Sequence, residues 1–197
     1  MDKRETKEKI LNATLNLISK KGYLGSTTRE IAMEAGVTEL TLFRHFGSKE
    51  RLFGEVLKRY SFLPALKESI PKMEGLSYED ALMNIGMLFI KTLKEKKPII
   101  KIMLSETNVY PDKVRKVHQV LMDRTIKTLS DFFKTLQKKG VLREFSPEIG
   151  TRAFLGMIFT YFKAEEIIKG RSLKKGEIEK TIREFVSIFT YGTLKRG

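Results

Sequence analysis

The chain has 197 residues, no cysteine and a net charge of +14. A hydrophobic content of 41% and a charged content of 31% are typical of a soluble globular protein with one large domain or two small ones. The lack of cysteine excludes disulfides and thiolate metal sites, and no apolar run reaches the roughly 20 residues that span a bilayer. Because the amino terminus is charged and shows no secretory signal, we expect a cytoplasmic protein.

The net charge indicates a polyanionic partner, but its distribution leaves two explanations open. Residues 1–60 hold twelve Lys and Arg against eight Asp and Glu, so most of the positive surplus lies further along the chain. A basic surface favours nucleic acid. A surface rich in Lys and Glu, with only four Asn and two Gln, is also typical of heat-adapted proteins. Charge therefore supports nucleic-acid binding without deciding it.

The first predicted helix covers residues 3–21 and ends at Gly22. Its apolar residues recur at helical spacing, which predicts a face that packs on the following helices. That face carries Ile10, Ala13, Thr14, Leu17 and Ile18. At its start, Lys3, Arg4 and Lys7 either contact phosphate or form a solvated helix end, and the sequence leaves both open.

Residues 27–35 predict a short helix with a defined start and end. Thr27 and Glu30 form a capping box, in which the hydroxyl accepts a backbone N–H of the first turn and the carboxylate reaches back to Thr27. Gly36 then supplies the left-handed residue at which such a helix ends.

A second short helix follows at once. Thr38 caps it, and Leu42 and Phe46, four residues apart, lie on its buried side. Ser48 caps a further helix that begins at Lys49. Two short helices joined by a tight turn are the layout of a DNA-reading helix-turn-helix.

This stretch resembles the amino-terminal domain of the TetR family of bacterial transcriptional regulators. The resemblance is specific for the first quarter of the chain and looser beyond it, where Gly140-Val141-Leu142-Arg143 and Ser146-Pro147-Glu148 look like a family connection. The matching amino-terminal segments are Lys21-Gly22-Tyr23, Thr27-Thr28-Arg29-Glu30-Ile31-Ala32, Ala35-Gly36-Val37, Thr41-Leu42-Phe43-Arg44-His45-Phe46 and Ser48-Lys49-Glu50.

Three positions depart from the family pattern. Leu40 stands where the family often has a glycine close to the DNA, and Glu39 puts an acid on the reading helix. Phe43 replaces a tyrosine whose hydroxyl binds phosphate in the family, so the packing is kept and that donor is lost. The differences at Leu40 and Glu39 bear on base preference, and the one at Phe43 bears on phosphate binding.

Beyond residue 49 the pattern predicts helices only. A helix runs from Lys49 toward Pro64, and Pro71, Gly75 and Ser77 mark a loop. No strand pattern or repeat is found, so the fold class is all-α, with about nine helices. The last five are predicted at 78–96, 98–106, 111–139, 147–169 and 174–195.

The resemblance divides these helices into two functional parts. It implies a three-helix helix-turn-helix DNA-binding domain at residues 1–48. It also implies a larger helical domain at residues 49–197 that binds an effector and forms the dimer.

DNA recognition is predicted from the helix starts and from the exposed side of the second short helix. The starts at Thr28 and Lys49 present free amides and a positive dipole end, which hold phosphate oxygens. An arginine can bind guanine through two hydrogen bonds, and a threonine can contact a thymine methyl. The predicted DNA-binding residues are Thr27, Thr28, Arg29, Thr38, Glu39, Leu40, Thr41, Arg44, His45 and Lys49.

Catalysis finds no support in the sequence. The motifs HExxH, GxSxG and GxxxxGK[ST] are missing, and the two histidines, His45 and His118, have no nucleophile motif beside them. We therefore predict that the chain is not an enzyme and holds neither a metal nor a cofactor.

In the TetR family, the helices that match 78–96, 98–106, 111–139 and 147–169 surround a cavity for a small apolar or amphipathic effector. This chain places many Met and aromatic residues there. Methionine suits a pocket that can repack as well as an irregular core, so the residues alone leave both open. The pocket residues that the resemblance and the spacing imply are Met87, Met103, Tyr110, His118, Met122, Phe154, Met157 and Tyr161.

The last two predicted helices are apolar around more of their circumference than one neighbouring helix would cover. Such an excess suits either a subunit interface or burial within the monomer, and the resemblance favours a homodimer. The predicted interface residues are Phe154, Ile158, Phe162, Ile182, Phe185, Val186 and Phe189.

Together, motif and resemblance predict a DNA-binding transcriptional regulator. We expect a homodimeric repressor that binds a pseudo-palindromic operator in double-stranded DNA, is released by a small hydrophobic or amphipathic effector, and does not associate with a membrane. Two alternatives stay open. One is a sequence-tolerant architectural DNA-binding protein, and the other is a sensor of hydrophobic small molecules with a vestigial DNA head.

Overall fold

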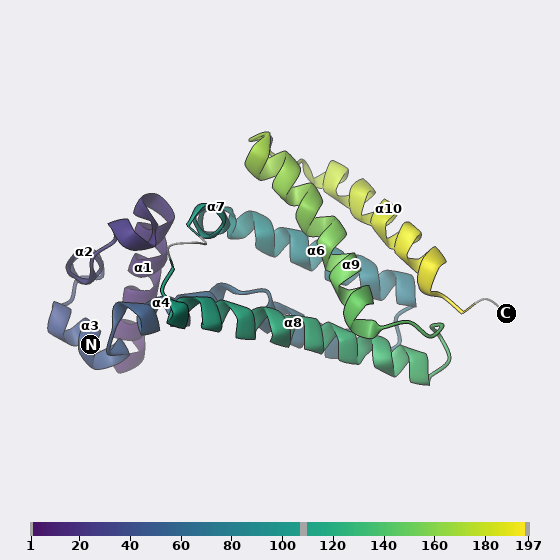
Figure 1. Ribbon diagram of the computed structural model, residues 1–197, viewed down its shortest axis with the longest axis horizontal. Helices are drawn as coiled ribbons and strands as arrows, with labels where there is room; N and C mark the ends of the chain where they lie inside the picture. The colour runs from purple at the N-terminus through teal and green to yellow at the C-terminus, as the bar shows by residue number, and fades with distance from the viewer. Residues whose placement is uncertain (1, 107–109, 196–197) are drawn as a thin grey trace. The chain divides into compact units, whose positions relative to one another are not determined.

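A computed structural model describes residues 2–106 and 110–195 of the chain (Figure 1). Within these residues the only extended pairing is an isolated bridge between Leu142 and Leu194, so the predicted all-α fold class is confirmed. None of the described helices has the length and apolar character that crossing a membrane requires. The helices are α1 (Lys3–Gly25), α2 (Thr28–Glu34), α3 (Glu39–Phe46), α4 (Lys49–Tyr60), α5 (Leu63–Ser69), the 3-10 helix η1 (Ile70–Met73), α6 (Tyr78–Glu95), α7 (Lys97–Ser105), α8 (Asp112–Lys138), α9 (Pro147–Phe162), the π-helix η2 (Lys163–Ile168) and α10 (Lys175–Thr193).

The chain packs into two compact units. The first contains residues 1–61 and 96–121, and the second contains residues 62–95 and 122–197. The chain therefore passes from one unit to the other at three points. Because these units are defined by packing alone, the functional boundary predicted between residues 48 and 49 stays a prediction.

The first unit is built around α1, which packs against α2, α4 and α7. Its buried face includes Ile10 and Ile18, as the helical spacing predicts. The predicted end of this helix at Gly22 is a break inside a longer element that runs to Gly25. At the break Gly22 has a φ of 78° and a ψ of 173°, which is not helical.

The helix-turn-helix forms as its sequence predicts. The Glu30 N–H donates to the Thr27 hydroxyl at 3.1 Å and the Thr27 N–H donates to the Glu30 carboxylate at 3.0 Å, which completes the capping box. Gly36 has a φ of 67° at the turn, and Thr38 caps α3 by accepting from the Thr41 N–H. The buried side of α3 carries Leu42 and Phe46.

One packing partner of the first unit comes from the middle of the chain. α7 has Pro98 in its first turn, where the missing N–H costs no helical hydrogen bond. The helix buries Ile99 and packs against α1. This contact joins segments far apart in the sequence, so local patterns could not predict it.

In the second unit, α6 packs against α9 and α10, and these two helices pack against each other (Figure 1). Phenylalanines fill much of the core between helices. Phe133, Phe154 and Phe162 are fully buried, and Phe189 lies 5.7 Å from Phe133 and 5.3 Å from Phe154 between ring centroids. Full burial of a side chain of this size stabilises a fold by roughly 1.5–3 kcal/mol.

The structure also differs from two of the helices predicted beyond residue 48. The helix predicted to run toward Pro64 ends at Tyr60, and α5 begins at Leu63 with the proline in its first turn. A proline excluded from a helix interior is well placed at a helix start, so Pro64 opens an element that the sequence pattern left out. The helix predicted at 147–169 changes from α to π geometry after Phe162.

Candidate nucleic-acid interface

The two helix starts on the candidate interface are capped by side chains. Thr27 caps α2, and at the start of α4 the Ser48 hydroxyl accepts from the Arg51 N–H at 3.2 Å. The remaining first-turn amides of α4 keep the positive end of the helix dipole available to an anion. Lys49 is the first residue of α4 and adds a full positive charge there. Phosphate binding at these two helix starts stays a prediction, with which their geometry agrees.

The acidic residue of the reading helix is engaged within the head. The Thr28 hydroxyl donates to the Glu39 carboxylate at 2.5 Å, and this bond joins the start of α2 to the start of α3. A carboxylate held in this way is directed toward α2. Glu39 is thus bound within the head, and the Thr28 hydroxyl is the group that binds it.

The exposed side of α3 combines polar and apolar side chains. The hydroxyls of Thr38 and Thr41 lie 2.8 Å apart, and Arg44 is exposed. Leu40 is 60% exposed and Phe43 is 41% exposed, although both are apolar. Apolar side chains that face outward on a reading helix are suited to contact thymine methyl groups. Phe43 was not among the predicted contacts, and its exposure places it on the same surface.

A shallow hollow of about 600 Å³ opens beside α3. It brings three of the predicted residues, Thr38, Thr41 and His45, together with Lys3 from the start of α1. The sequence left the role of Lys3 open, and the structure places it beside the predicted contact residues. The hollow is lined by Lys3, Thr6, Met33, Gly36, Val37, Thr38, Thr41 and His45.

The basic side chains of the head differ in their partners. Lys21 pairs with Glu30 at 2.8 Å, and Lys7 lies 3.8 Å from Glu55, so these cations are partly neutralised. In the described parts of the chain, Arg29 and Arg44 form no ion pair with an acidic residue. Unpaired arginines at exposed positions are available to phosphates and base edges.

Lys49 lies over an aromatic ring. Its Nζ is 4.4 Å from the centroid of the Tyr23 ring, and its side chain is half-buried. Burial lowers the pKa of Lys49, while the charges of Glu50 and Glu106 act in the opposite direction. The ammonium therefore lies over the Tyr23 ring at the start of α4.

Comparison with known proteins decides the family. Residues 10–56 match the profile of bacterial regulatory proteins of the tetR family. Residues 80–192 match the profile of the carboxy-terminal domain of AefR-like transcriptional repressors. The chain belongs to the TetR family.

Relatives of similar length support this assignment. The uncharacterized HTH-type transcriptional regulator YvkB of Bacillus subtilis is 32% identical over 190 residues, which cover 96% of this chain and 97% of YvkB. Among solved structures, a TetR-family regulator from Mesorhizobium loti has a TM-score of 0.84 at 23% identity, covering 98% of this chain and 100% of that one. The Flavonoid-responsive Regulator FrrA has a TM-score of 0.76 at 23% identity and covers 100% of both chains. This TetR-family protein is a DNA-binding transcriptional regulator.

The effector residues predicted for this TetR-family protein lie in both compact units. Met103, Tyr110 and His118 belong to the first unit, and the other five belong to the second. Phe154 is fully buried, and Met122 is 48% exposed on the surface. The hollow beside α3 and a second one of about 480 Å³ next to α8 and α9 are lined by none of the eight. In the described residues, no three His, Cys, Asp or Glu side chains group to hold a metal.

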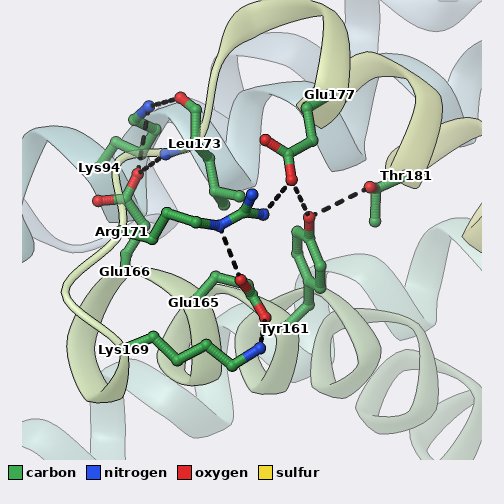
Figure 2. A network of polar contacts seen from close by, with 9 residues as sticks. All are labelled: Lys94, Tyr161, Glu165, Glu166, Lys169, Arg171, Leu173, Glu177 and Thr181. Atoms are coloured by element: carbon green, nitrogen blue, oxygen red, sulfur yellow. Dashed lines mark hydrogen bonds and ion pairs between the residues drawn. The ribbon is translucent and has the colours of Figure 1, made fainter.

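Tyr161 contributes its hydroxyl to a polar network at the end of α9 (Figure 2). The hydroxyl donates to the Glu177 carboxylate at 3.3 Å, and the Thr181 hydroxyl donates to it at 3.4 Å. Arg171 also pairs with Glu177, and its Nε lies 3.0 Å from the Glu165 carboxylate. A hydroxyl with these partners has its hydrogen-bonding capacity used within the protein. The structure thus gives Tyr161 a role in joining α9 to α10.

The interface residues predicted for α9 and α10 need correction. Six of the seven are buried within the second unit, where they pack against neighbouring helices as core side chains. Only Phe185 keeps part of its surface exposed. The excess of apolar circumference on these helices therefore reflects burial against α6 as well as any outer surface. The six buried residues are Phe154, Ile158, Phe162, Ile182, Val186 and Phe189.

Proposed function

We propose that this TetR-family regulator is a homodimeric repressor that binds a pseudo-palindromic operator and is released by a small hydrophobic or amphipathic effector. The observation that carries the proposal is the helix-turn-helix, with two capped helix starts for phosphate and an exposed reading face. Because DNA is the proposed ligand, a cytoplasmic location is part of the same proposal.

In this proposal the head divides its work between two kinds of contact. Lys49 and the start of α4 bind the DNA backbone and set the register. Arg44, with Thr41 and Leu40, faces the bases of the major groove. Arg29 at the start of α2 and Lys3 beside the hollow add backbone contacts.

Dimerisation is proposed through the outward side of α10. Phe185 is partly exposed there, Ile188 is 63% exposed and Tyr191 is 75% exposed, and the three are spaced along one side of the helix. Large apolar side chains left exposed in this way are typical of protein–protein interfaces. A two-fold dimer would present its heads to half-sites about 34–36 Å apart, one turn of the DNA.

The effector is proposed to bind the carboxy-terminal helices. The match to AefR-like repressors covers these helices, and FrrA is by its name a flavonoid-responsive regulator of the same fold. Met87 and Met157 are half-buried in the second unit, where flexible side chains can rearrange around an apolar ligand. The effector would release the operator only through a higher affinity for the conformation that does not fit the DNA.

Selection of bound duplexes from a random DNA library, at physiological salt, tests the proposal. Enrichment of an inverted repeat is the expected result. Recovery of unenriched DNA would instead indicate a sequence-tolerant architectural protein. Recovery of no DNA, together with tight binding of small apolar molecules, would indicate a sensor whose DNA head is vestigial. Release of the selected DNA by candidate effectors then tests the response.

A further inference from the structure

A carboxylate from α7 holds the break in α1. The backbone N–H of Tyr23 donates to the Glu106 carboxylate at 2.9 Å, across 83 positions of sequence. Glu106 ends α7, and its own N–H donates to the Ile102 carbonyl oxygen at 2.9 Å. The carboxylate is thus fixed at the end of one helix and satisfies a backbone donor that the break in another helix leaves free.

Gly22 makes room for this carboxylate. Its φ of 78° is a conformation that residues with a side chain rarely adopt. A Cβ at this position would also lie 2.0 Å from the Glu106 Oε1, so any other residue would displace the carboxylate. The positive φ and the close approach of the Glu106 carboxylate therefore both require glycine at position 22.

The contact leads directly to the DNA-facing side of the head. Tyr23, whose N–H is held, packs its ring against Phe53 of α4 at 5.2 Å and against Tyr110 at 5.8 Å between centroids. The same ring lies under the Lys49 ammonium at 4.4 Å. Glu106 therefore fixes the backbone of the residue that carries the ring on which Lys49 rests.

The surroundings of this ring are buried and acidic. Burial, followed by the charge of Glu50, raises the pKa of Tyr23 to about 12. Burial, followed by the charge of Glu106, raises the pKa of Tyr110 well above its usual range. Both tyrosines thus stay neutral and form the ring platform between Glu106 and Lys49.

We propose that Glu106 is a positioning residue for DNA binding, which holds Tyr23 so that Lys49 is aimed at a DNA phosphate. The inference rests on the proposed role of Lys49 as a phosphate ligand. It gives α7 a part in DNA binding, although no residue of α7 belongs to the helix-turn-helix. Whatever moves the end of α7 would then change the strength of the phosphate contact.

Charge and positioning predict opposite effects for the loss of Glu106. Removing an acid from a DNA-binding protein should tighten DNA binding if charge alone matters. Removing the residue that places Lys49 should weaken it. The Glu106→Ala variant therefore separates the two, and Glu144→Ala, which removes the same charge from an exposed position outside the head, is the matched control.

The experiment measures the affinity of the full chain for its selected duplex and for random duplexes over a range of salt concentrations. We expect Glu106→Ala to weaken both about three- to tenfold and to flatten the salt dependence by about one released ion. Glu106→Gln keeps an acceptor for the Tyr23 N–H and should bind within about threefold of the parent. Glu106→Asp keeps the charge but is too short for this bond, so it should lose affinity. Glu144→Ala should bind as tightly as the parent or more tightly.

A double-mutant cycle with Lys49→Ala completes the test. If Glu106 acts through Lys49, then adding Glu106→Ala to Lys49→Ala should weaken binding no further. Additive losses, or tighter binding by Glu106→Ala alone, would overturn the proposal. If Lys49→Ala itself has no effect, the proposed phosphate role of Lys49 fails. If Lys49→Ala weakens binding and both Glu106→Ala and Glu106→Asp do not, only the positioning role fails.

Discussion

At the scale of single residues, Arg44 is the side chain best placed to read a base. It is exposed on α3, and no acidic residue in the described parts of the chain pairs with it. Lys49 differs, because it begins a helix and is partly enclosed by Tyr23. Arg44 and Lys49 are both positively charged, but we expect Arg44 to determine sequence preference and Lys49 to provide affinity for the DNA backbone.

We expect Arg44→Ala to relax base preference. The variant should lose about 10- to 100-fold in affinity for the selected operator, which corresponds to roughly 1–3 kcal/mol for a base contact, and little for random DNA. Lys49→Ala should lose affinity for the operator and for random DNA by a similar factor. Equal losses of Arg44→Ala on operator and random duplexes, measured at one salt concentration, would assign Arg44 to the backbone instead.

Tyr78 makes the second unit sensitive to alkaline pH. Its hydroxyl lies 3.1 Å from the Thr193 hydroxyl in a buried site. Burial raises the pKa of Tyr78 to about 12 and outweighs the hydrogen bond with Thr193, which lowers this pKa. Above pH 10 the unfolded chain loses this proton first, so the free energy of unfolding should fall until about pH 12. The expected fall is about 2–3 kcal/mol. Denaturant unfolding of Tyr78→Phe beside the parent measures it, and parallel pH profiles of the two would refute it.

At the scale of elements, the π-helix η2 organises the connection between α9 and α10. It supplies Glu165 and Glu166 from adjacent positions, and Figure 2 shows the two carboxylates reaching different partners. Glu166 is 2% exposed, lies 3.3 Å from the Lys94 ammonium of α6 and accepts from the Leu173 N–H at 2.8 Å. One buried carboxylate thus joins α6, η2 and the segment before α10.

Glu166→Ala should strongly destabilise the second unit. The variant leaves the Lys94 ammonium and the Leu173 N–H without this partner in a largely buried site, at an expected cost of about 3 kcal/mol. Glu179→Ala is the control, because it removes an exposed carboxylate that pairs with Arg183 and should cost less than about 1 kcal/mol. Chemical denaturation compares the two, and equal small losses would show that the network contributes little.

The elements also show how far local sequence determines this fold. The capping residues Thr27, Thr38 and Ser48 act within three residues of their partners, so the sequence alone predicts them. The π turn after Phe162 has no such local signal in the sequence, and the carboxylate of Glu166 within it binds the Leu173 N–H seven residues on. Contacts such as the one between Glu106 and Tyr23 depend on where distant helices meet. They could be found only with the structure.

At the scale of the whole molecule, the sequence predicted the family fold well. It predicted less well which apolar side chains belong to the core and which to a subunit interface. Helical spacing identifies residues on an apolar face, but it does not tell a core from a subunit interface. Phe154 and Ile182 illustrate this, since both were assigned to the interface and both are fully buried within the second unit. Tyr161 was assigned to the effector pocket by the same reasoning, and its hydroxyl is used between α9 and α10.

The interface proposed on the outward side of α10 makes a prediction about assembly. Ile188→Glu places a charge at the centre of the outward side of α10 and should convert the dimer to a monomer, because burial of an unpaired carboxylate is costly. Leu76→Glu changes an exposed apolar residue outside that side and should leave the dimer intact. Sedimentation velocity distinguishes the two species. A dimer that persists in Ile188→Glu would place the interface elsewhere.

The central claim is that two linked heads read the two halves of one site. It is tested most directly by measuring affinity at physiological salt for the selected operator and for the same operator with five base pairs inserted between its halves. The insertion turns one half by about half a helical turn and moves it away from its head. We predict that the affinity falls to that of a single half-site. Equal affinity for both duplexes would contradict a dimer that reads a two-fold site.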